Sequence, residues 1–129
     1  MVALFTVLTG IAVIWTTVTY LHVFNAVREH LPPQFQDYEN ARYAFSVWAL
    51  QHPTPLSVQA EYVRFVKGSI VMGLSGGLAL LSSGQPVLMV FGCGFLAAFL
   101  YGVFFAIRCS RTYEQNCKRA EARNDEQNQ

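Results

Sequence analysis

Three long stretches of the chain carry almost only apolar side chains, and polar segments separate them. The first runs over about 2–24 and is dominated by valine, leucine, isoleucine and threonine. No Asp, Glu, Lys or Arg occurs in the 26 residues from Val2 to Val27. A helix needs about 20 apolar residues to cross the roughly 30 Å of hydrocarbon in a bilayer. The pattern therefore predicts a first transmembrane helix over about 2–24.

A second charge-free stretch covers 40 residues, over 68–107. As one straight helix it would be roughly 60 Å long, about twice the hydrocarbon thickness, so we expect it to fold back. Two serines, a glycine and a proline cluster at 82–86 between apolar runs, which is typical of a turn. The sequence thus predicts an all-α integral membrane protein whose second and third spans, about 64–82 and 87–107, form a tight antiparallel hairpin.

The segment between the first two spans, over about 27–63, contains an amphipathic pattern at 34–50. The apolar positions recur at three- and four-residue spacings and are Phe35, Tyr38, Ala41, Phe45 and Trp48. This spacing predicts a helix. We interpret it as an interfacial helix in the headgroup plane; the alternative is that its aromatic face binds a partner protein. Thr54 and Pro55 then supply an N-cap and a first helical residue, so a new helix should begin there.

Interfacial anchors are expected where this segment meets the second span. Trp48 and Tyr62 have the amphipathic rings that favour the headgroup level. Arg64 and Lys67 lie at the start of the second span, where long cationic side chains extend to the headgroups. These four residues are the predicted anchors.

The charged residues indicate a topology. Of the 129 residues only 13% are charged, against about 25% in soluble domains. The nine cationic side chains are Arg28, Arg42, Arg64, Lys67, Arg108, Arg111, Lys118, Arg119 and Arg123. None lies before the first span or in the turn, so the positive-inside rule predicts an outside N-terminus and a cytoplasmic C-terminus, in what we expect to be a bacterial inner membrane.

Two further expectations concern the ends of the chain. Residues 1–5 carry no basic side chain, so we expect the first apolar run to be a membrane anchor and not a cleaved signal peptide. The polar tail, over 108–129, should be helical at first and then fray in the cytoplasm. With a net charge of +1, the chain has no electrostatic footprint for nucleic acid.

Small residues recur at every fourth position in the second and third spans. They are Ser69, Gly73 and Gly77 in the former, and Gly94, Ala98, Gly102 and Ala106 in the latter. In lipid, such stripes allow two helices to approach closely. Pairing residues whose numbers sum to 171 places Gly73 opposite Ala98. We therefore predict that the two stripes form the hairpin contact, with these two backbones closest.

The sequence offers little chemistry. The span centres carry no ionisable residue, although such residues mark most pumps and proton relays. His22, near the end of the first span, is the only candidate; we expect a locally satisfied histidine, and the alternative is a ligand or proton relay. Cys93, Cys109 and Cys117 form no metal-binding or redox motif. We therefore expect no catalytic residue, cofactor or metal site.

In layout, the short chain with three spans, an outside N-terminus and a charged tail resembles phage holins of the three-span class. It resembles the bacterial universal stress protein B family more faintly, and neither resemblance carries a functional residue across. The expected function is that of a non-enzymatic accessory, assembly or regulatory subunit, with the lipid bilayer and other membrane subunits or copies of itself as partners. The alternative is a holin-like permeability protein whose pathway would be lined by Thr6, Thr9, Thr16 and Thr17.

Overall fold

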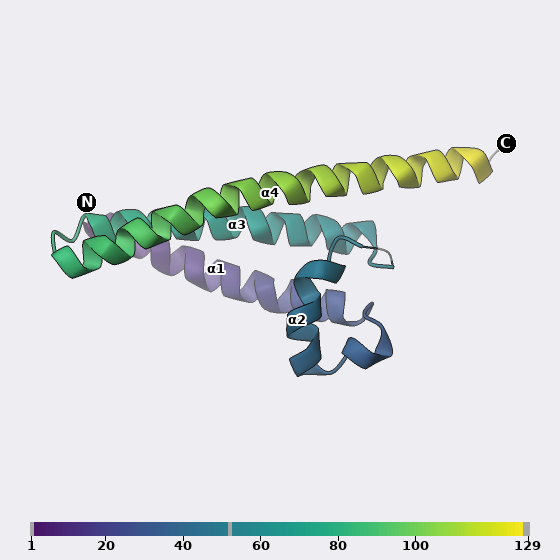
Figure 1. Cartoon of the computed structure of the whole chain (residues 1–129), viewed down its shortest axis with the longest axis horizontal. Coiled ribbons are helices and arrows are strands. Elements are labelled where there is room, and N and C mark those ends of the chain that lie inside the picture. The colour runs from purple at the N-terminus through teal and green to yellow at the C-terminus, as the bar shows by residue number, and fades with distance from the viewer. Residues whose placement is uncertain (1, 52, 128–129) are drawn as a thin grey trace. The chain divides into compact units, whose positions relative to one another are not determined.

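The computed structural model describes residues 2–51 and 53–127, which form helices and turns without a strand. The elements are α1 (Val2–Arg28), the short 3₁₀ helix η1 (Pro33–Phe35), α2 (Tyr38–Trp48), α3 (Leu56–Leu81) and α4 (Pro86–Gln127) (Figure 1). Three of them, α1, α3 and α4, are long and apolar enough to cross a membrane. This confirms the expectation of an all-helical chain with three such helices.

The chain forms two compact units that share these long helices. The span unit comprises Met1–Leu21 and Arg64–Ala106, and the loop unit comprises His22–Val63 and Ile107–Gln129. The span unit thus holds the apolar parts of α1, α3 and α4. The loop unit holds the end of α1, all of α2, the start of α3 and the polar part of α4.

A four-residue turn joins α3 to α4 at the place where the sequence predicts it. Gly84 has a φ of 72°, a left-handed conformation that glycine adopts without steric cost. The Ser83 hydroxyl donates to the Leu80 carbonyl at 2.7 Å and accepts the Gln85 N–H at 3.4 Å. Pro86 then begins α4, since a proline at the first helical position removes an N–H that has no partner in the helix.

The amphipathic segment differs from the single helix expected over 34–50. It is divided into η1 and α2, and Asp37 between them has extended backbone angles, φ −61° and ψ 141°. Pro33 does not account for this break, because a proline restricts only the residue before it, here Pro32, which lies ahead of η1. α3 begins at Leu56, directly after Thr54 and Pro55.

The polar tail also differs from the expectation, because α4 continues as a helix to Gln127 without fraying among the described residues. The tail contains strong helix formers such as Ala120 and Ala122. It also places opposite charges four residues apart, as at Glu114 and Lys118, a spacing that stabilises exposed helices. The helix propensity of the alanines and the pairs of opposite charge therefore favour a helix here, although the tail is polar in composition.

Candidate functional sites in the two units

In the span unit, glycines bring α3 and α4 together at one point. A methyl group added to Gly92 would lie 3.1 Å from the Gly77 carbonyl oxygen and 2.9 Å from Cγ of Leu81. One added to Gly77 would lie 3.0 Å from Cδ2 of Leu96. All three distances are shorter than ordinary van der Waals contacts, so a side chain at either glycine would force its neighbours to shift. Sequence reasoning included Gly77 but missed Gly92, because the residue four positions later is the bulky Leu96.

The stripe of small residues on α4 was expected to face α3, but only its C-terminal half, Gly102 and Ala106, is packed. Gly94 has no atom within 4 Å of an added methyl group, and both Gly94 and Ala98 are exposed. Gly102 contacts Ile70, and Ala106 is buried. A step of four residues turns about 40° beyond one full helical turn, so a four-residue stripe winds around its helix. From 94 to 106 the stripe therefore rotates about 120°, from the exposed face to the packed one.

The α3 stripe lies closer to the expected contact, but its neighbours on α4 are larger than expected. Gly77 is buried, and a methyl group on Gly73 would lie 3.7 Å from Cβ of Phe99, in the place expected for Ala98. Ser69 is partly exposed, and its hydroxyl donates to the Phe65 carbonyl at 2.7 Å. The glycines of α3 thus accommodate bulky side chains of α4, which gives more dispersion contact than small residues facing each other.

Two further glycines of α3 accommodate α1 within the span unit, and sequence reasoning missed both. The Trp15 ring occupies the space that a side chain at Gly68 would need. Gly76 lies against Thr9, where a methyl group would be 3.6 Å from Cγ2. The signal for both was present in the sequence, because neither glycine fits a turn or a helix end. α3 is therefore the helix on which the other two pack.

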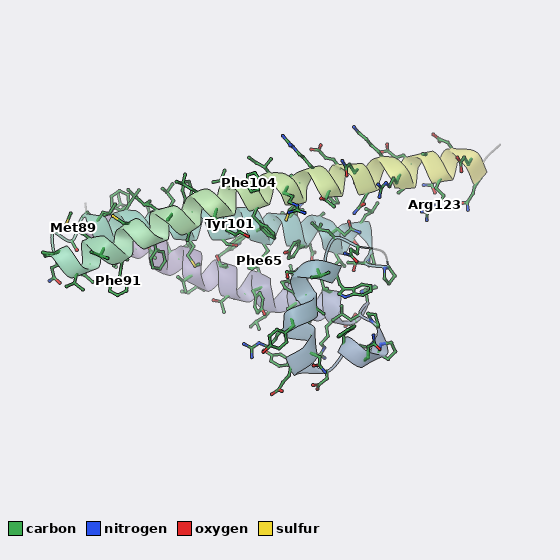
Figure 2. All side chains as sticks on the ribbon, viewed as in Figure 1. Phe65, Met89, Phe91, Tyr101, Phe104 and Arg123 are labelled. Atoms are coloured by element: carbon green, nitrogen blue, oxygen red, sulfur yellow. The ribbon has the colours of Figure 1, made fainter. Side chains whose placement is uncertain are left out.

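Most of the span unit's apolar surface remains uncovered. Only 6% of the residues in the most apolar windows of α1 and α4 are buried, against 28% in α3. Ile14 on α1 is 68% exposed, and Phe91 and Phe104 stand away from α4 (Figure 2). Such a continuous apolar surface is unusual for a soluble monomer and indicates a membrane location.

The loop unit has an aromatic cluster at its centre, formed by Phe24, Tyr38, Phe45 and Tyr62. The ring centroid of Phe24 lies 5.4 Å from that of Tyr38 and 5.6 Å from that of Phe45. The centroids of Phe45 and Tyr62 are 5.3 Å apart. These are the separations of favourable tilted and edge-to-face ring pairs. The apolar face of α2 is therefore covered from within the chain, by the end of α1 and the start of α3.

This cluster changes the setting of the predicted anchors. Tyr62 is 3% exposed, so its ring is enclosed in protein. Trp48 is partly exposed, while Arg64 and Lys67 are exposed. Tyr43 on α2 is 86% exposed and was not among the four predicted anchors. Its four-residue spacing from Val47, which is also exposed, was a signal for a second apolar face.

His22 has a partner in the loop unit. Its Nε2 lies 3.3 Å from Oε2 of Glu61, and both side chains are substantially exposed. Among the described residues no group of three His, Cys, Asp or Glu side chains is placed to hold a metal ion. All three cysteines are free thiols, with Cys93 exposed and Cys109 buried. A histidine paired with one exposed carboxylate is an ordinary surface contact, and it does not by itself indicate catalysis.

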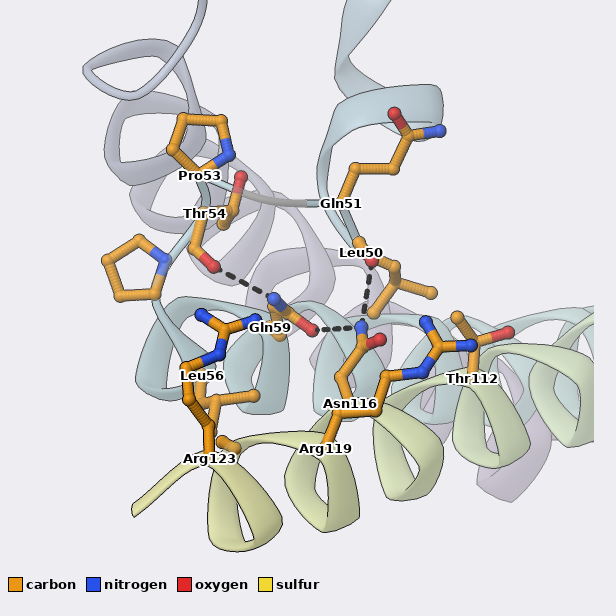
Figure 3. A pocket seen from close by; sticks show the side chains of 12 residues that line it. Leu50, Gln51, Pro53, Thr54, Leu56, Gln59, Thr112, Asn116, Arg119 and Arg123 are labelled. Atoms are coloured by element: carbon orange, nitrogen blue, oxygen red, sulfur yellow. Dashed lines mark hydrogen bonds between the residues drawn. The ribbon is translucent and has the colours of Figure 1, made fainter. Parts of the chain in front are cut away.

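A pocket of about 600 Å³ with a mixed polar and apolar lining lies in the loop unit, between the start of α3 and the polar part of α4. Asn116 donates one N–H of its amide to the Leu50 carbonyl at 2.9 Å and the other to Oε1 of Gln59 at 2.8 Å (Figure 3). Gln59 in turn donates to the Thr54 carbonyl at 2.8 Å, and the Thr54 hydroxyl donates to the Trp48 carbonyl at 2.9 Å. This chain of hydrogen bonds connects α2, α3 and α4.

The geometry defines the class as a small helical protein with three helices suited to a membrane. Comparison with protein-family models, with curated proteins and with solved structures finds no match for the chain. Its function must therefore be inferred from its own residues.

Proposed function

We propose that this protein is a non-enzymatic subunit of the bacterial inner membrane that acts in assembly or regulation through helix–helix association. The partner is another membrane protein or a second copy of this chain. In this proposal α3 and α4 form an antiparallel transmembrane hairpin, the N-terminus is outside and the C-terminus is cytoplasmic. The one-sided distribution of all nine Lys and Arg residues supports that orientation.

The observation that carries the proposal is the open part of the α4 stripe. Gly94 and Ala98 are exposed, and nothing lies within 4 Å of a methyl group added to Gly94. Small residues four apart on a lipid-exposed surface let a second helix approach closely, and the contact gains dispersion energy. Because Gly92 and Leu96 already serve the contact with α3, this face is available to a helix from another chain.

A pair of matched variants tests this proposal. A photoreactive amino acid at position 98 should crosslink to a protein neighbour in native membranes. Gly94→Leu should strongly reduce that crosslink because the leucine holds the partner helix away. Gly10→Leu is the control, since Gly10 is equally open and exposed but lies on α1. Crosslinks to lipid alone, or a protein crosslink that Gly94→Leu leaves unchanged, would contradict the proposal.

The proposal also places α2 at the membrane interface, where only its exposed residues would contact the headgroups. With Ala41, Ala44 and Phe45 buried inside the loop unit, the large exposed residues of α2 that could contact headgroups are Tyr38, Tyr43 and Val47. Tyrosine favours the headgroup level because its ring is apolar and its hydroxyl is polar. Trp48, Arg64 and Lys67 would contribute at the same depth.

The holin-like alternative receives less support from α1. The hydroxyls of Thr9 and Thr17 donate to the carbonyls of Phe5 and Val13, four residues earlier in the same helix, at 2.7 and 2.8 Å. Such bonds satisfy the hydroxyls within the helix, so these threonines do not need a water-filled pathway. Thr16 is buried against protein, where it would not line one.

A further inference from the structure

The pocket of the loop unit carries positive charge. Among the described residues, the charged side chains that line it are Arg119 and Arg123. They are four residues apart on α4 and therefore lie on one face of that helix. Figure 3 shows Arg119 reaching toward Thr112 and Arg123 reaching toward the start of α3, so that they lie on either side of Asn116. Both arginines are exposed and belong to α4, so the positive charge lies along the α4 wall of the pocket.

The walls of this pocket are already built without a ligand. Gln59 and Thr54 are buried, and their hydrogen bonds to Asn116 and to the Trp48 carbonyl hold the start of α3 in place. Neither guanidinium is held in an ion pair anywhere in 2–51 and 53–127. The cationic groups are therefore available to a ligand, while the neutral amides that shape the site are committed to one another.

The start of α3 adds to the positive potential. Pro53, Thr54, Pro55 and Leu56 line the pocket, and α3 begins at Leu56. The first N–H groups of a helix have no partner within it, and its N-terminus carries a partial positive charge. This helix end supplements the arginines in attracting an anion, and the arginine pair remains the principal feature.

We propose that this pocket binds an anion that carries a phosphate ester, held by Arg119 and Arg123. Guanidinium groups bind phosphate oxygens through paired hydrogen bonds, which a carboxylate-lined or neutral pocket does not provide. The volume of about 600 Å³ exceeds the needs of a simple ion and is typical of sites for small organic ligands. The apolar side chains of Leu50, Leu56 and Ala120 line the remainder and would contact a glycerol or other carbon moiety.

The same chemistry occurs in a phospholipid headgroup and in a soluble phosphate ester. The full-length protein in a neutral detergent should therefore be titrated separately with phosphatidylglycerol, with glycerol 3-phosphate and with phosphatidylcholine, and the bound species counted by native mass spectrometry. Retention of phosphatidylglycerol alone would identify a lipid headgroup, and retention of glycerol 3-phosphate would identify a soluble ester. Failure to retain either anion above the level of phosphatidylcholine would overturn the proposal.

Matched charge variants separate a built site from general attraction. Arg119→Gln with Arg123→Gln should weaken binding of the retained anion about 10- to 100-fold, because two charged hydrogen-bond donors are lost. Arg108→Gln with Arg111→Gln removes the same charge from exposed positions of α4 that do not line the pocket. This control should leave binding within about twofold, the weak effect expected of exposed charges that do not contact the ligand. Equal weakening by both pairs would overturn the proposal.

A second kind of variant tests the pocket without replacing the arginines, in case the arginine variants lose their structure. Ala120→Glu places a carboxylate among the lining residues of an exposed helix, where glutamate has a good helix propensity. It should abolish binding of the anion while the helical circular dichroism stays unchanged. Anion binding that survives this substitution would contradict the pocket assignment.

Discussion

The two units of this chain differ in where their large apolar side chains lie. In the loop unit the buried positions include large aromatic residues, with Phe24 only 1% exposed, and hydrogen bonds join segments 57 and 66 residues apart. In the span unit the close contacts are at glycines, and large side chains such as Ile14 point outward. A soluble protein does the reverse and buries its most apolar segments.

The difference in packing corresponds to a difference between water and hydrocarbon as the surrounding medium. Burying apolar surface stabilises a fold in water, and the loop unit uses that driving force. In hydrocarbon the same burial gains little, so helices associate through close backbone contact and dispersion. The span unit shows this second pattern, in agreement with its three apolar helices.

The largest effect is expected in the aromatic cluster of the loop unit. Phe45→Ala should lower the free energy of unfolding by about 3–5 kcal/mol, because it leaves a cavity among packed rings. Phe104→Ala removes the same atoms from an exposed position of the span unit and should change stability by less than about 0.5 kcal/mol. Reversible unfolding in mixed micelles measures both. Similar losses for the two variants would remove the distinction between the units.

The next effect concerns the exposed surface itself. Ile14→Arg should make insertion of α1 less favourable by about 2.5–3.5 kcal/mol, the cost of a cation near the centre of a membrane helix. Tyr43→Arg replaces a side chain that is even more exposed, but in the loop unit, and insertion should be unchanged. Glycosylation-mapping of membrane insertion provides the readout. Efficient insertion of the Ile14 variant would show that this face of α1 does not meet lipid.

A smaller effect is expected at the glycine crossing. Gly92→Leu should destabilise the contact between α3 and α4 by about 1–3 kcal/mol, because the added side chain meets the Gly77 carbonyl and Leu81. Gly10→Leu adds the same side chain in open space and is the control. Unfolding of the purified protein by steric trapping measures the change. Equal stability of the two variants would mean that the close approach at Gly92 is unimportant.

The smallest effect tests the hydrogen bonds of the loop unit. Thr54→Val keeps the shape of the side chain but removes the bond to the Trp48 carbonyl, at a cost of about 0.5–1.5 kcal/mol. Thr17→Val removes a bond within one exposed helix and should cost less. Amide hydrogen exchange around the start of α3 should speed up only in the Thr54 variant. Faster exchange in neither variant would contradict a structural role for this network.

Much of the fold could be predicted because it follows from local sequence signals. Charge-free runs define the three long helices, and the cluster around Gly84 defines the turn between two of them. The break between η1 and α2 was missed because periodicity responds to side-chain spacing and does not detect the extended backbone at Asp37. The helical tail was missed because polar composition was given more weight than the propensity of its alanines.

The contacts were harder to predict than the elements. A four-residue count located Gly77 but treated the helix as having four residues per turn, and so it placed Gly94 and Ala98 on the packed face. Trp15 against Gly68 could not be inferred, since the partner of a glycine is fixed by three-dimensional packing and leaves no local pattern. Likewise Arg119 and Arg123 resemble an ordinary solvated helix face until Gln59 and Asn116 are brought together.

One measurement tests most directly whether the exposed apolar face of the span unit contacts lipid. Spin labels would be attached at position 14 and at position 43 of a cysteine-free variant in lipid vesicles, and their collisions compared with oxygen and with a water-soluble nickel chelate. Oxygen concentrates in hydrocarbon and the chelate in water. We predict that oxygen relaxes the label at 14 more strongly and the chelate the label at 43. Strong relaxation of the label at 14 by the chelate would contradict the account.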